Sequence, residues 1–229
     1  MSKTMSDRAA VFPWGQEPED DWQQSLTPPG DGHGKIPKLD GRLARSQRTR
    51  AAVIEALIGL LEEGEFKPPA KVIAERSGVS TRSIFQHFPD LETLFTAAVA
   101  HGVNQFAPLV QPISDHLALP ARINALARQR VELFEKAGNV YWAGQIAAPL
   151  SDTLRDTFHR VEYILRVQIE VALKPELIRL RKPKRMAIVA RLAAVVGFHG
   201  WYGLRRVQGL TPGETRAAMV SFIASQLPE

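Results

Sequence analysis

Two polar side chains, Arg82 and Gln86, stand four residues apart in the stretch Ser80 to Phe88. Residues at this spacing share one face of a helix. Arg and Gln can each make paired hydrogen bonds to base edges in the major groove of DNA, so this face has the chemistry for reading bases. Ile84 and Phe88 fall on the opposite face, which predicts a packing side. The alternative is a surface helix whose polar face is only solvated.

A second helix and a glycine turn are predicted to position this face. Ala74 stands four residues before Gly78, so a small side chain faces the point where the helices cross. Gly78 can adopt the positive φ that ends a helix, and Ser80 is a suitable N-cap. Lys71 to Phe88 is therefore predicted to form a helix-turn-helix, with the second helix as the recognition helix.

Basic residues gather at the start of the preceding helix, which we expect to begin near Ser46. The first turn of that helix is expected to carry Arg45, Arg48, Thr49 and Arg50. Positive charge there opposes the helix dipole at a cost of about 0.3 to 1 kcal/mol, which favours a nearby anion such as DNA phosphate. The charge also changes sign along the chain, because residues 1–34 hold two basic and six acidic side chains, and residues 35–50 hold six basic side chains and one acidic.

The composition predicts a helical protein with a substantial core. The chain has 229 residues, of which 45% are hydrophobic, and little strand-like alternation. Its net charge of +5 suits a polyanionic partner. Disulfides and cysteine-ligated metals are excluded because the chain has no cysteine. No apolar run reaches the roughly 18 residues of a membrane span, and no signal pattern opens the chain, so we expect no membrane association and a cytoplasmic protein.

The sequence does not indicate an enzyme. The histidines form no metal-spaced pair, no phosphate-binding loop is present, and the acidic residues are not paired in a plausible cleft. We therefore expect no catalytic residues, no metal and no cofactor. The histidines are His33, His87, His101, His116, His159 and His199.

Breakers and composition divide the chain into three parts. Residues 1–40 are rich in Pro and Gly and are predicted to be a disordered tail. The tail could be passive, its aromatic residues could dock, or its acidic run Glu17 to Asp21 could compete with DNA. Residues 41–90 form the predicted helix-turn-helix domain, and residues 91–229 a larger helical domain. A helix from about Leu91 to Gln105, capped by Asp90, joins the two domains.

The remaining helices are predicted from breakers and apolar spacing. We expect helices over Pro120–Lys136, about Val140–Ala148 and Asp152–Leu173, separated by Gly138 and Pro149. The basic stretch from Lys174 to Arg185 is read as a solvated loop, with a second nucleic-acid patch as the alternative.

Small and apolar residues mark the last two helices as a candidate dimer interface. The penultimate helix is predicted over about Lys184 to Gln208, and Thr211 to Glu214 is a capping box that opens the last helix. Two such helices suggest a homodimer built as a four-helix bundle, with packing inside one chain as the alternative. The candidate contacts are Ala193, Gly197, Gly200, Trp201, Val220 and Ile223.

The segment from about Ser46 to Val99 resembles the DNA-binding domain of the TetR family of bacterial transcriptional regulators. The resemblance rests on the pattern IAxRxGVSxxxxxxHF, which runs from Ile73 to Phe88, on the long helix before it and on the start PDLETLF after it. It implies an all-α TetR-like fold, with an N-terminal three-helix unit containing the helix-turn-helix and a larger C-terminal helical bundle. It also implies a homodimer whose C-terminal domain dimerises and often holds a small-molecule effector.

Position by position, the resemblance implies two sets of DNA contacts. The expected base-edge residues are Thr81, Arg82, Phe85 and Gln86, and the expected phosphate contacts are Arg45, Arg48, Thr49, Lys71, Ser83 and His87. The chain departs from the family pattern in two places. Phe85 replaces a common tyrosine, which leaves only apolar contact such as with a thymine methyl group. Pro69 replaces a common capping threonine or serine.

Aromatic residues with a few polar tips are the candidates for an effector pocket, although ordinary core is the more common role of such a residue. They are Phe106, Phe134, Trp142, Gln145, Phe158, His159, Tyr163, Phe198 and His199. We therefore expect a homodimeric repressor that binds a palindromic double-stranded operator and is released by an apolar or amphipathic effector. The alternative is an architectural DNA-binding protein, or a regulator controlled by a protein partner, without a ligand pocket.

Overall fold

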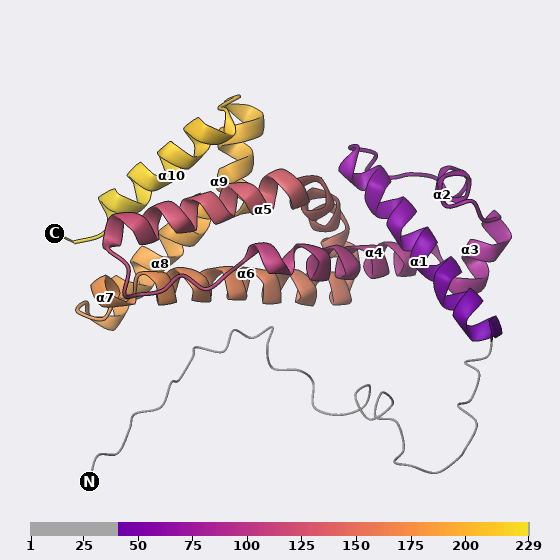
Figure 1. Cartoon of the computed structure of the whole chain (residues 1–229), viewed down its shortest axis with the longest axis horizontal. Coiled ribbons are helices and arrows are strands. Elements are labelled where there is room, and N and C mark those ends of the chain that lie inside the picture. Colours follow the sequence, from indigo (N-terminus) through magenta and orange to yellow (C-terminus); the bar gives the residue numbers. More distant parts are fainter. Residues whose placement is uncertain (1–40, 229) are drawn as a thin grey trace, which may run out of the picture.

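A computed structural model describes residues 41–228 of the chain, and this part is built from helices without any strand (Figure 1). A small group of helices, α1 to α3, forms one end of an elongated molecule, and the longer helices form the other end. The expected all-α fold is confirmed for this part of the chain. The tail predicted over residues 1–40 lies outside the described residues.

The small unit consists of α1 (Gly41–Glu62), α2 (Ala70–Ser77) and α3 (Thr81–His87). Its core is closed by residues from all three helices, including Leu57, Ile73 and Ile84. Helix α1 begins before Ser46, because helix-compatible residues continue the helix back to Gly41. Arg45 and Arg48 therefore lie beyond the first turn, and the predicted conflict with the helix dipole is weaker than expected.

The local signals between α2 and α4 act as predicted. Gly78 has φ of +70° and ends α2, and the Ser80 hydroxyl accepts a hydrogen bond from the Ser83 N–H at 3.1 Å. Pro69 precedes α2 and gives it no side-chain cap. Asp90 caps α4 (Leu91–Phe106) through the Thr93 N–H at 2.7 Å. These caps fix the angles at which α2, α3 and α4 follow one another.

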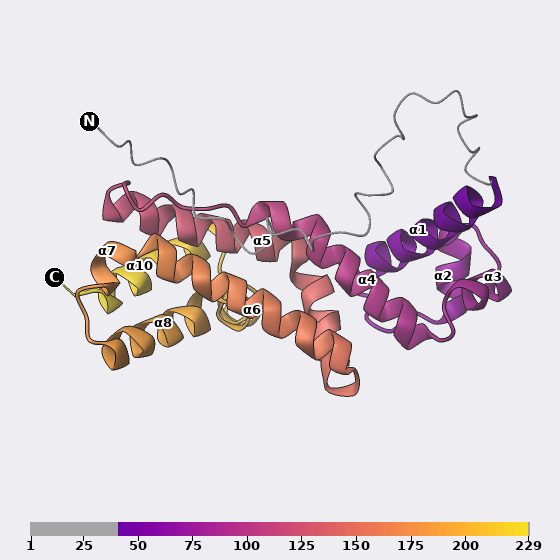
Figure 2. The same ribbon diagram turned by 90° about the horizontal axis from the view of Figure 1, so that it is seen from below.

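The larger part begins at α4 and continues through the elements that make the bundle. After α4 the chain passes through η2 (Ala107–Leu109), α5 (Leu119–Ala147), η3 (Ala148–Leu150), α6 (Asp152–Ala172) and α7 (Lys174–Leu177). It ends with α8 (Lys182–Val196), α9 (Phe198–Tyr202), the π-helical turn η4 (Gly203–Val207) and α10 (Pro212–Gln226). Helix α6 lies along α5 on one side and α8 on the other (Figure 2), and α10 packs on α5 and α8.

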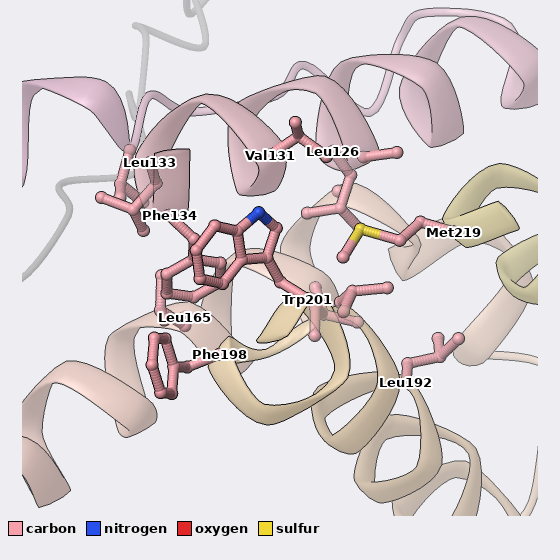
Figure 3. Packing of buried hydrophobic residues seen from close by; sticks show 14 of the residues in the cluster. Leu126, Val131, Leu133, Phe134, Leu165, Leu192, Phe198, Trp201 and Met219 are labelled. Carbon is pink, nitrogen blue, oxygen red and sulfur yellow. The ribbon is translucent and has the colours of Figure 1, made fainter. Parts of the chain in front are cut away.

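Helix α5 is one continuous helix, so the predicted break at Gly138 is wrong. Gly138 is buried in the middle of α5, and a Cβ atom there would lie 2.6 Å from the indole ring of Trp201. The glycine therefore makes room for Trp201 instead of ending the helix. Trp201 itself sits at the centre of the main core with Phe134, Phe198 and Met219 around it (Figure 3).

The predicted penultimate helix is broken in two. Helix α8 ends at Val196, and the following helical segment is bent away from it by 42°. A Cβ atom at Gly197 would clash with the carbonyl oxygen of Ala193, and one at Gly200 with that of Val195. These two glycines thus permit a bend within one chain. The sequence pattern had predicted instead that they lie at a contact with another helix.

Within the described residues, no single helix is long and apolar enough to span a membrane. The bent pair of α8 with α9 and η4 passes that test only when the two parts are joined. Its apolar residues include Leu192, Val196 and Trp201, and all three are buried in the core.

Candidate nucleic-acid interface and cavities

Helix α3 presents most of the predicted base-reading side chains to solvent. Thr81, Arg82 and Gln86 are exposed, and the ring of Phe85 is 44% exposed. Ile84 and Phe88 on the other face are fully buried in the core of the small unit. The expected two-sided character of this helix is thus present, with polar donors outward and apolar anchors inward.

Arg50 fastens the C-terminal end of α3 to α1. Its guanidinium Nη1 donates to the carbonyl oxygen of His87 at 3.1 Å, and its Cζ atom lies 4.4 Å from the centre of the Phe88 ring. The last carbonyl groups of a helix lack partners within the helix, so this bond satisfies one of them. Sequence reasoning placed Arg50 only in the basic cluster, because its partner lies 37 residues away.

The predicted phosphate contacts line the edges of the same unit. Arg45, Arg48 and Lys71 are exposed on α1 and α2. The Thr49 hydroxyl donates to the Arg45 carbonyl at 3.1 Å, so only its acceptor side remains for an outside donor. Ser83 and His87 are half-buried. Lys71 Nζ lies 4.0 Å from Glu75 at the surface, where such a pair contributes little and leaves the lysine available to another anion.

An exposed ion pair holds α2 against α1. Arg76 donates to both carboxylate oxygens of Glu63, at 2.6 and 2.7 Å, and its guanidinium passes over Gly59. The hydrogen bonds from Arg76 hold the pKa of Glu63 below its usual value. A Cβ atom at residue 59 would lie 2.9 Å from Arg76 Nη2, so the glycine permits this approach.

The core of the small unit extends past its predicted boundary at residue 90. It takes in Leu94 and Ala98 of α4 and Val140 and Ala143 of α5. In addition, Asn139 of α5 donates to the carbonyl oxygen of Glu62 at the end of α1, at 2.7 Å. The sequence indicated α4 as the link between the two parts, and the structure adds α5 as a second link.

An apolar cavity of about 50 Å³ lies between α4, α5 and α6. Of the predicted pocket residues, Phe106, Phe134 and Phe158 line it. Its other walls come from residues that sequence reasoning missed, among them Val99, Gly102, Val103, Val140, Tyr141 and Leu165. Aliphatic residues at ordinary core spacing carry no signal for a cavity, because only the packing of distant helices creates it.

A larger and more polar groove of about 480 Å³ lies between α6 and the junction of α8 and α9, reaching the end of α5. Five predicted residues line it, namely Gln145, Phe158, His159, Phe198 and His199. Phe158 borders both this groove and the apolar cavity, so its ring separates them. Glu162 and Arg155 also line the groove, although sequence reasoning singled out neither of them.

Two predicted pocket residues lie elsewhere. Trp142 is stacked on Tyr202, with ring centres 4.8 Å apart, and lines neither of these spaces. The side chain of Tyr163 is 61% exposed on the outside of α6. Neither residue is therefore part of the walls of the cavity or the groove.

The structure places two of the predicted dimer contacts inside one chain. Trp201 and Ile223 are 1% and 0% exposed within the main core, so their side chains offer no surface to a second chain. Ala193, Gly200 and Val220 are half-buried, and Gly197 is buried. The exposed alanines of these helices are Ala187, Ala190 and Ala194 on α8 and Ala217 and Ala224 on α10.

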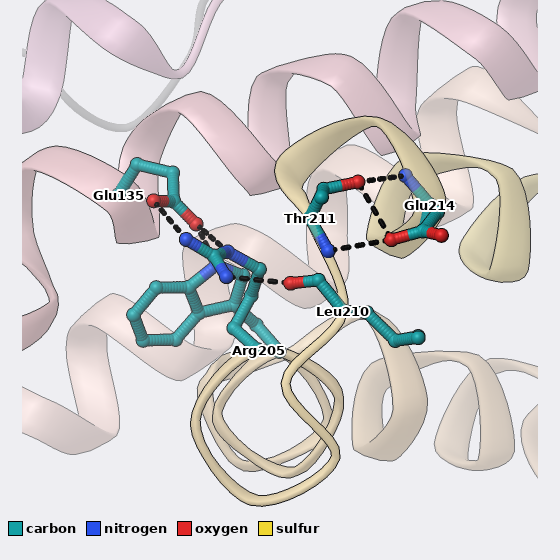
Figure 4. Close-up of polar contacts among 6 residues, drawn as sticks. Glu135, Arg205, Leu210, Thr211 and Glu214 are labelled. Atoms are coloured by element: carbon teal, nitrogen blue, oxygen red, sulfur yellow. Dashed lines mark hydrogen bonds and ion pairs between the residues drawn. The ribbon is translucent and has the colours of Figure 1, made fainter.

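Several charged groups that are buried or half-buried serve the fold of the larger part. Arg205 donates to Glu135 (Figure 4). Trp201 Nε1 donates to the same carboxylate at 3.0 Å. The predicted capping box is present, since Thr211 and Glu214 each bond the other's backbone N–H. Arg122, also buried, donates to both oxygens of Glu176, at 2.7 and 2.5 Å. The predicted solvated stretch after Leu173 is thus partly helical and tied to α5 through Glu176.

Two further polar groups lie near the cavities. Arg130 is fully buried and donates to Gln168 Oε1 at 2.5 Å and to the Leu165 carbonyl at 2.7 Å, and this burial lowers its pKa to about 10. Tyr141 donates its hydroxyl to Glu162, and burial together with this carboxylate raises the tyrosine's pKa. Among residues 41–228, no group of three or more His, Asp or Glu side chains is arranged to hold a metal ion.

Comparison with known proteins gives matches in structure but not in sequence. No protein-family model and no curated protein matches the chain. A TetR-family transcriptional regulator from Streptomyces coelicolor superposes with a TM-score of 0.65 at 18% identity, covering 79% of this chain and 80% of that one.

Two other similar structures were solved with small molecules. A proposed transcriptional regulator from Saccharomonospora viridis, in complex with choline, gives a TM-score of 0.61 at 18% identity and covers 80% of this chain and 99% of that one. A multidrug binding protein complexed with imidazole gives 0.55 at 18% identity, covering 80% and 94%. At such identities, the likeness establishes the fold.

Proposed function

We propose that the chain, which has the fold of TetR-family transcriptional regulators, is a sequence-specific DNA-binding regulator that acts as a homodimeric repressor. The observation that carries this proposal is the outer face of α3, where Thr81, Arg82 and Gln86 are exposed. Arg and Gln read guanine and adenine through paired hydrogen bonds. The surrounding basic residues Arg45, Arg48 and Lys71 would neutralise phosphates on either side.

A dimer would place two α3 helices in successive major grooves, roughly 34 Å apart, on a palindromic site. We propose the outward faces of α8 and α10 as the dimer interface. These helices pack against each other in one chain and carry exposed alanines, which allow close approach of another helix pair. Ala190 and Ala217 would lie within this interface.

We further propose that a small molecule bound in the larger part releases the operator. The supporting features are the groove beside Phe158 and the two links through α4 and α5, which join the cavity walls to the small unit. Val140 supports this coupling, because it lines the cavity and also packs in the core of the small unit. The similar structures solved with choline and imidazole make small ligands reasonable effectors for this fold.

One observation favours the alternative of a regulator controlled by a protein partner. The apolar cavity measures about 50 Å³, well below the roughly 300 to 1,000 Å³ of typical ligand sites. An effector must therefore bind in a wider groove, such as the one beside Phe158, or open the cavity. If neither happens, control would pass to a partner on the surface. We propose no catalytic activity for either case.

The base-reading role is tested with Arg82→Ala on an operator selected from a random DNA pool. We expect the selected sequence to be palindromic, and the substitution to weaken specific binding by about 1 to 3 kcal/mol and to relax preference at one base pair in each half-site. Arg128→Ala is the matched control, because Arg128 is an exposed arginine on α5 in the larger part. Unchanged affinity and base preference in Arg82→Ala would exclude the proposed contact.

A further inference from the structure

A single carboxylate, that of Glu162, lies between the polar groove and the aromatic core. Glu162 is half-buried on α6 and lines the groove of about 480 Å³. One of its oxygens accepts the hydroxyl hydrogen bond of Tyr141. Within the described part of the chain, Glu162 forms no ion pair and no second side-chain hydrogen bond. A half-buried carboxylate of this kind retains the ability to bind a cation.

Every other charged or titratable group facing the groove is either paired or at its rim. Arg155 is ion-paired with Asp152 one turn earlier on α6. His159 and His199 are exposed. Arg130 lies in the core behind α6 and directs its donors to Gln168 and to the Leu165 carbonyl. Arg130 therefore influences Glu162 at longer range without neutralising it by contact.

Aromatic rings form the wall beside this carboxylate. Phe158 and Phe198 line the groove, and Tyr141 packs against both, with ring centres 4.9 and 4.4 Å away. Phe198 is in turn held from behind by Phe134 and Trp201 (Figure 3). Faces of aromatic rings attract organic cations, and quaternary ammonium groups are bound in proteins by such rings next to a carboxylate.

We propose that the groove between α6 and α9 is an effector site for an organic cation, with Glu162 as its counter-charge and Phe158 and Phe198 as its aromatic wall. This inference rests on the proposed function. It specifies that the effector is positively charged, where the sequence predicted only an apolar or amphipathic molecule. The volume of about 480 Å³ accommodates a cation with an apolar substituent. Rotation of Phe158 would let that substituent enter the apolar cavity, because the ring borders both spaces.

The test uses three probes of nearly equal shape on the full chain. They are choline, its neutral isostere dimethylbutanol and the anionic dimethylbutanoate, each titrated by calorimetry. We expect choline to bind more tightly than both others. In Glu162→Gln, the ratio of choline affinity to dimethylbutanol affinity should fall by about ten- to a hundredfold, the contribution of a hydrogen-bonded charge.

The affinity ratio distinguishes loss of the charge contact from damage to the fold, because a misfolded variant would lose affinity for choline and dimethylbutanol together. Glu170→Gln is the matched control, since Glu170 lies on the same helix in an exposed pair with Arg166 at 3.1 Å, and its ratio should stay unchanged. Tyr141→Phe keeps the ring and removes the bond to Glu162, so it should keep the preference for choline. Equal binding of choline and dimethylbutanol by the wild type, or tighter binding of dimethylbutanoate, would overturn the proposal.

The outcome separates this inference from the proposed function. Operator binding that responds to Arg82→Ala, together with no preference for choline, would reject the cation site and leave the regulator intact. A preference for choline that depends on Glu162, together with no specific DNA binding, would support the cation site and reject the regulator.

Discussion

At the scale of single residues, the side chains that hold α3 in position differ from those that we propose to touch DNA. Arg82 and Gln86 face outward from α3, whereas Arg50 binds the last turn of that helix from α1. The base-reading candidates followed from spacing within one helix. The role of Arg50 could not be predicted in the same way, because it depends on how α1 and α3 cross.

Arg50→Ala should weaken DNA binding although we assign Arg50 no base contact. The substitution removes the bond to the His87 carbonyl and the contact with the Phe88 ring, so α3 should fray at its C-terminal end. We expect the free energy of unfolding to fall by about 1 kcal/mol. We expect the free energy of operator binding to weaken by more than that. Thermal unfolding and gel-shift titration measure the two effects.

The comparison for Arg50 is Arg50→Lys, which keeps the charge but loses the planar guanidinium. If Arg50 acts only through its charge on phosphate, the lysine variant should bind the operator like the wild type. If it positions α3, the lysine variant should remain impaired.

At the scale of elements, sequence signals within a few residues predicted the structure well. Gly78, Ser80 and Asp90 end or cap the helices where expected. The glycines of the larger part were misread, since Gly138 makes room for Trp201 and Gly197 permits a bend. A glycine that breaks a helix and one that accepts a neighbouring ring look alike in sequence, and only the long-range packing distinguishes them.

The contact between α5 and α7 predicts a pH-dependent contribution to stability. Hydrogen bonds from Arg122 hold the pKa of Glu176 below its usual value. A carboxyl group with a lowered folded pKa stabilises the fold above its unfolded pKa, about 4.3, and this contribution is lost as the pH falls through the folded value. Glu176→Gln should cost about 3 kcal/mol at neutral pH, because Arg122 is left buried without its partner.

Chemical unfolding of the two proteins between neutral and acidic pH checks this prediction. The difference between wild type and Glu176→Gln should shrink as the pH falls below the unfolded pKa of about 4.3, and it should be smallest below the lowered folded pKa, where the wild-type carboxyl group is protonated in both states. Glu132→Gln serves as the control because Glu132 forms an exposed pair with Lys136, and its effect should stay within about 0.5 kcal/mol. A difference that is constant with pH would contradict the assigned role of the Glu176 charge.

At the scale of the whole molecule, the proposed dimer makes a prediction about α8. Ala190 is exposed in one chain, so Ala190→Glu should leave the protomer folded. It should nevertheless dissociate the dimer, because each copy would bury an unpaired carboxylate at a close helix contact. Sedimentation equilibrium and circular dichroism report the two properties. Retention of the wild-type dimer would exclude this face as the interface.

The wild-type chain and the variant should also differ in operator binding. Loss of the dimer would weaken binding to a palindromic site much more than binding to a single half-site. An exposed alanine elsewhere, such as Ala121 on α5, provides the control, since Ala121→Glu should change neither the mass of the assembly nor the binding.

Val140 belongs at once to the wall of the apolar cavity and to the core of the small unit. The small unit therefore cannot be exchanged as a cassette ending at residue 90. A chimera that carried only residues 41–90 into a related scaffold would place foreign side chains in the core around Leu57 and Ile84, where Leu94, Val140 and Ala143 now pack. A functional graft would need α4 and this turn of α5 as well, so the natural unit of exchange is discontinuous in the chain.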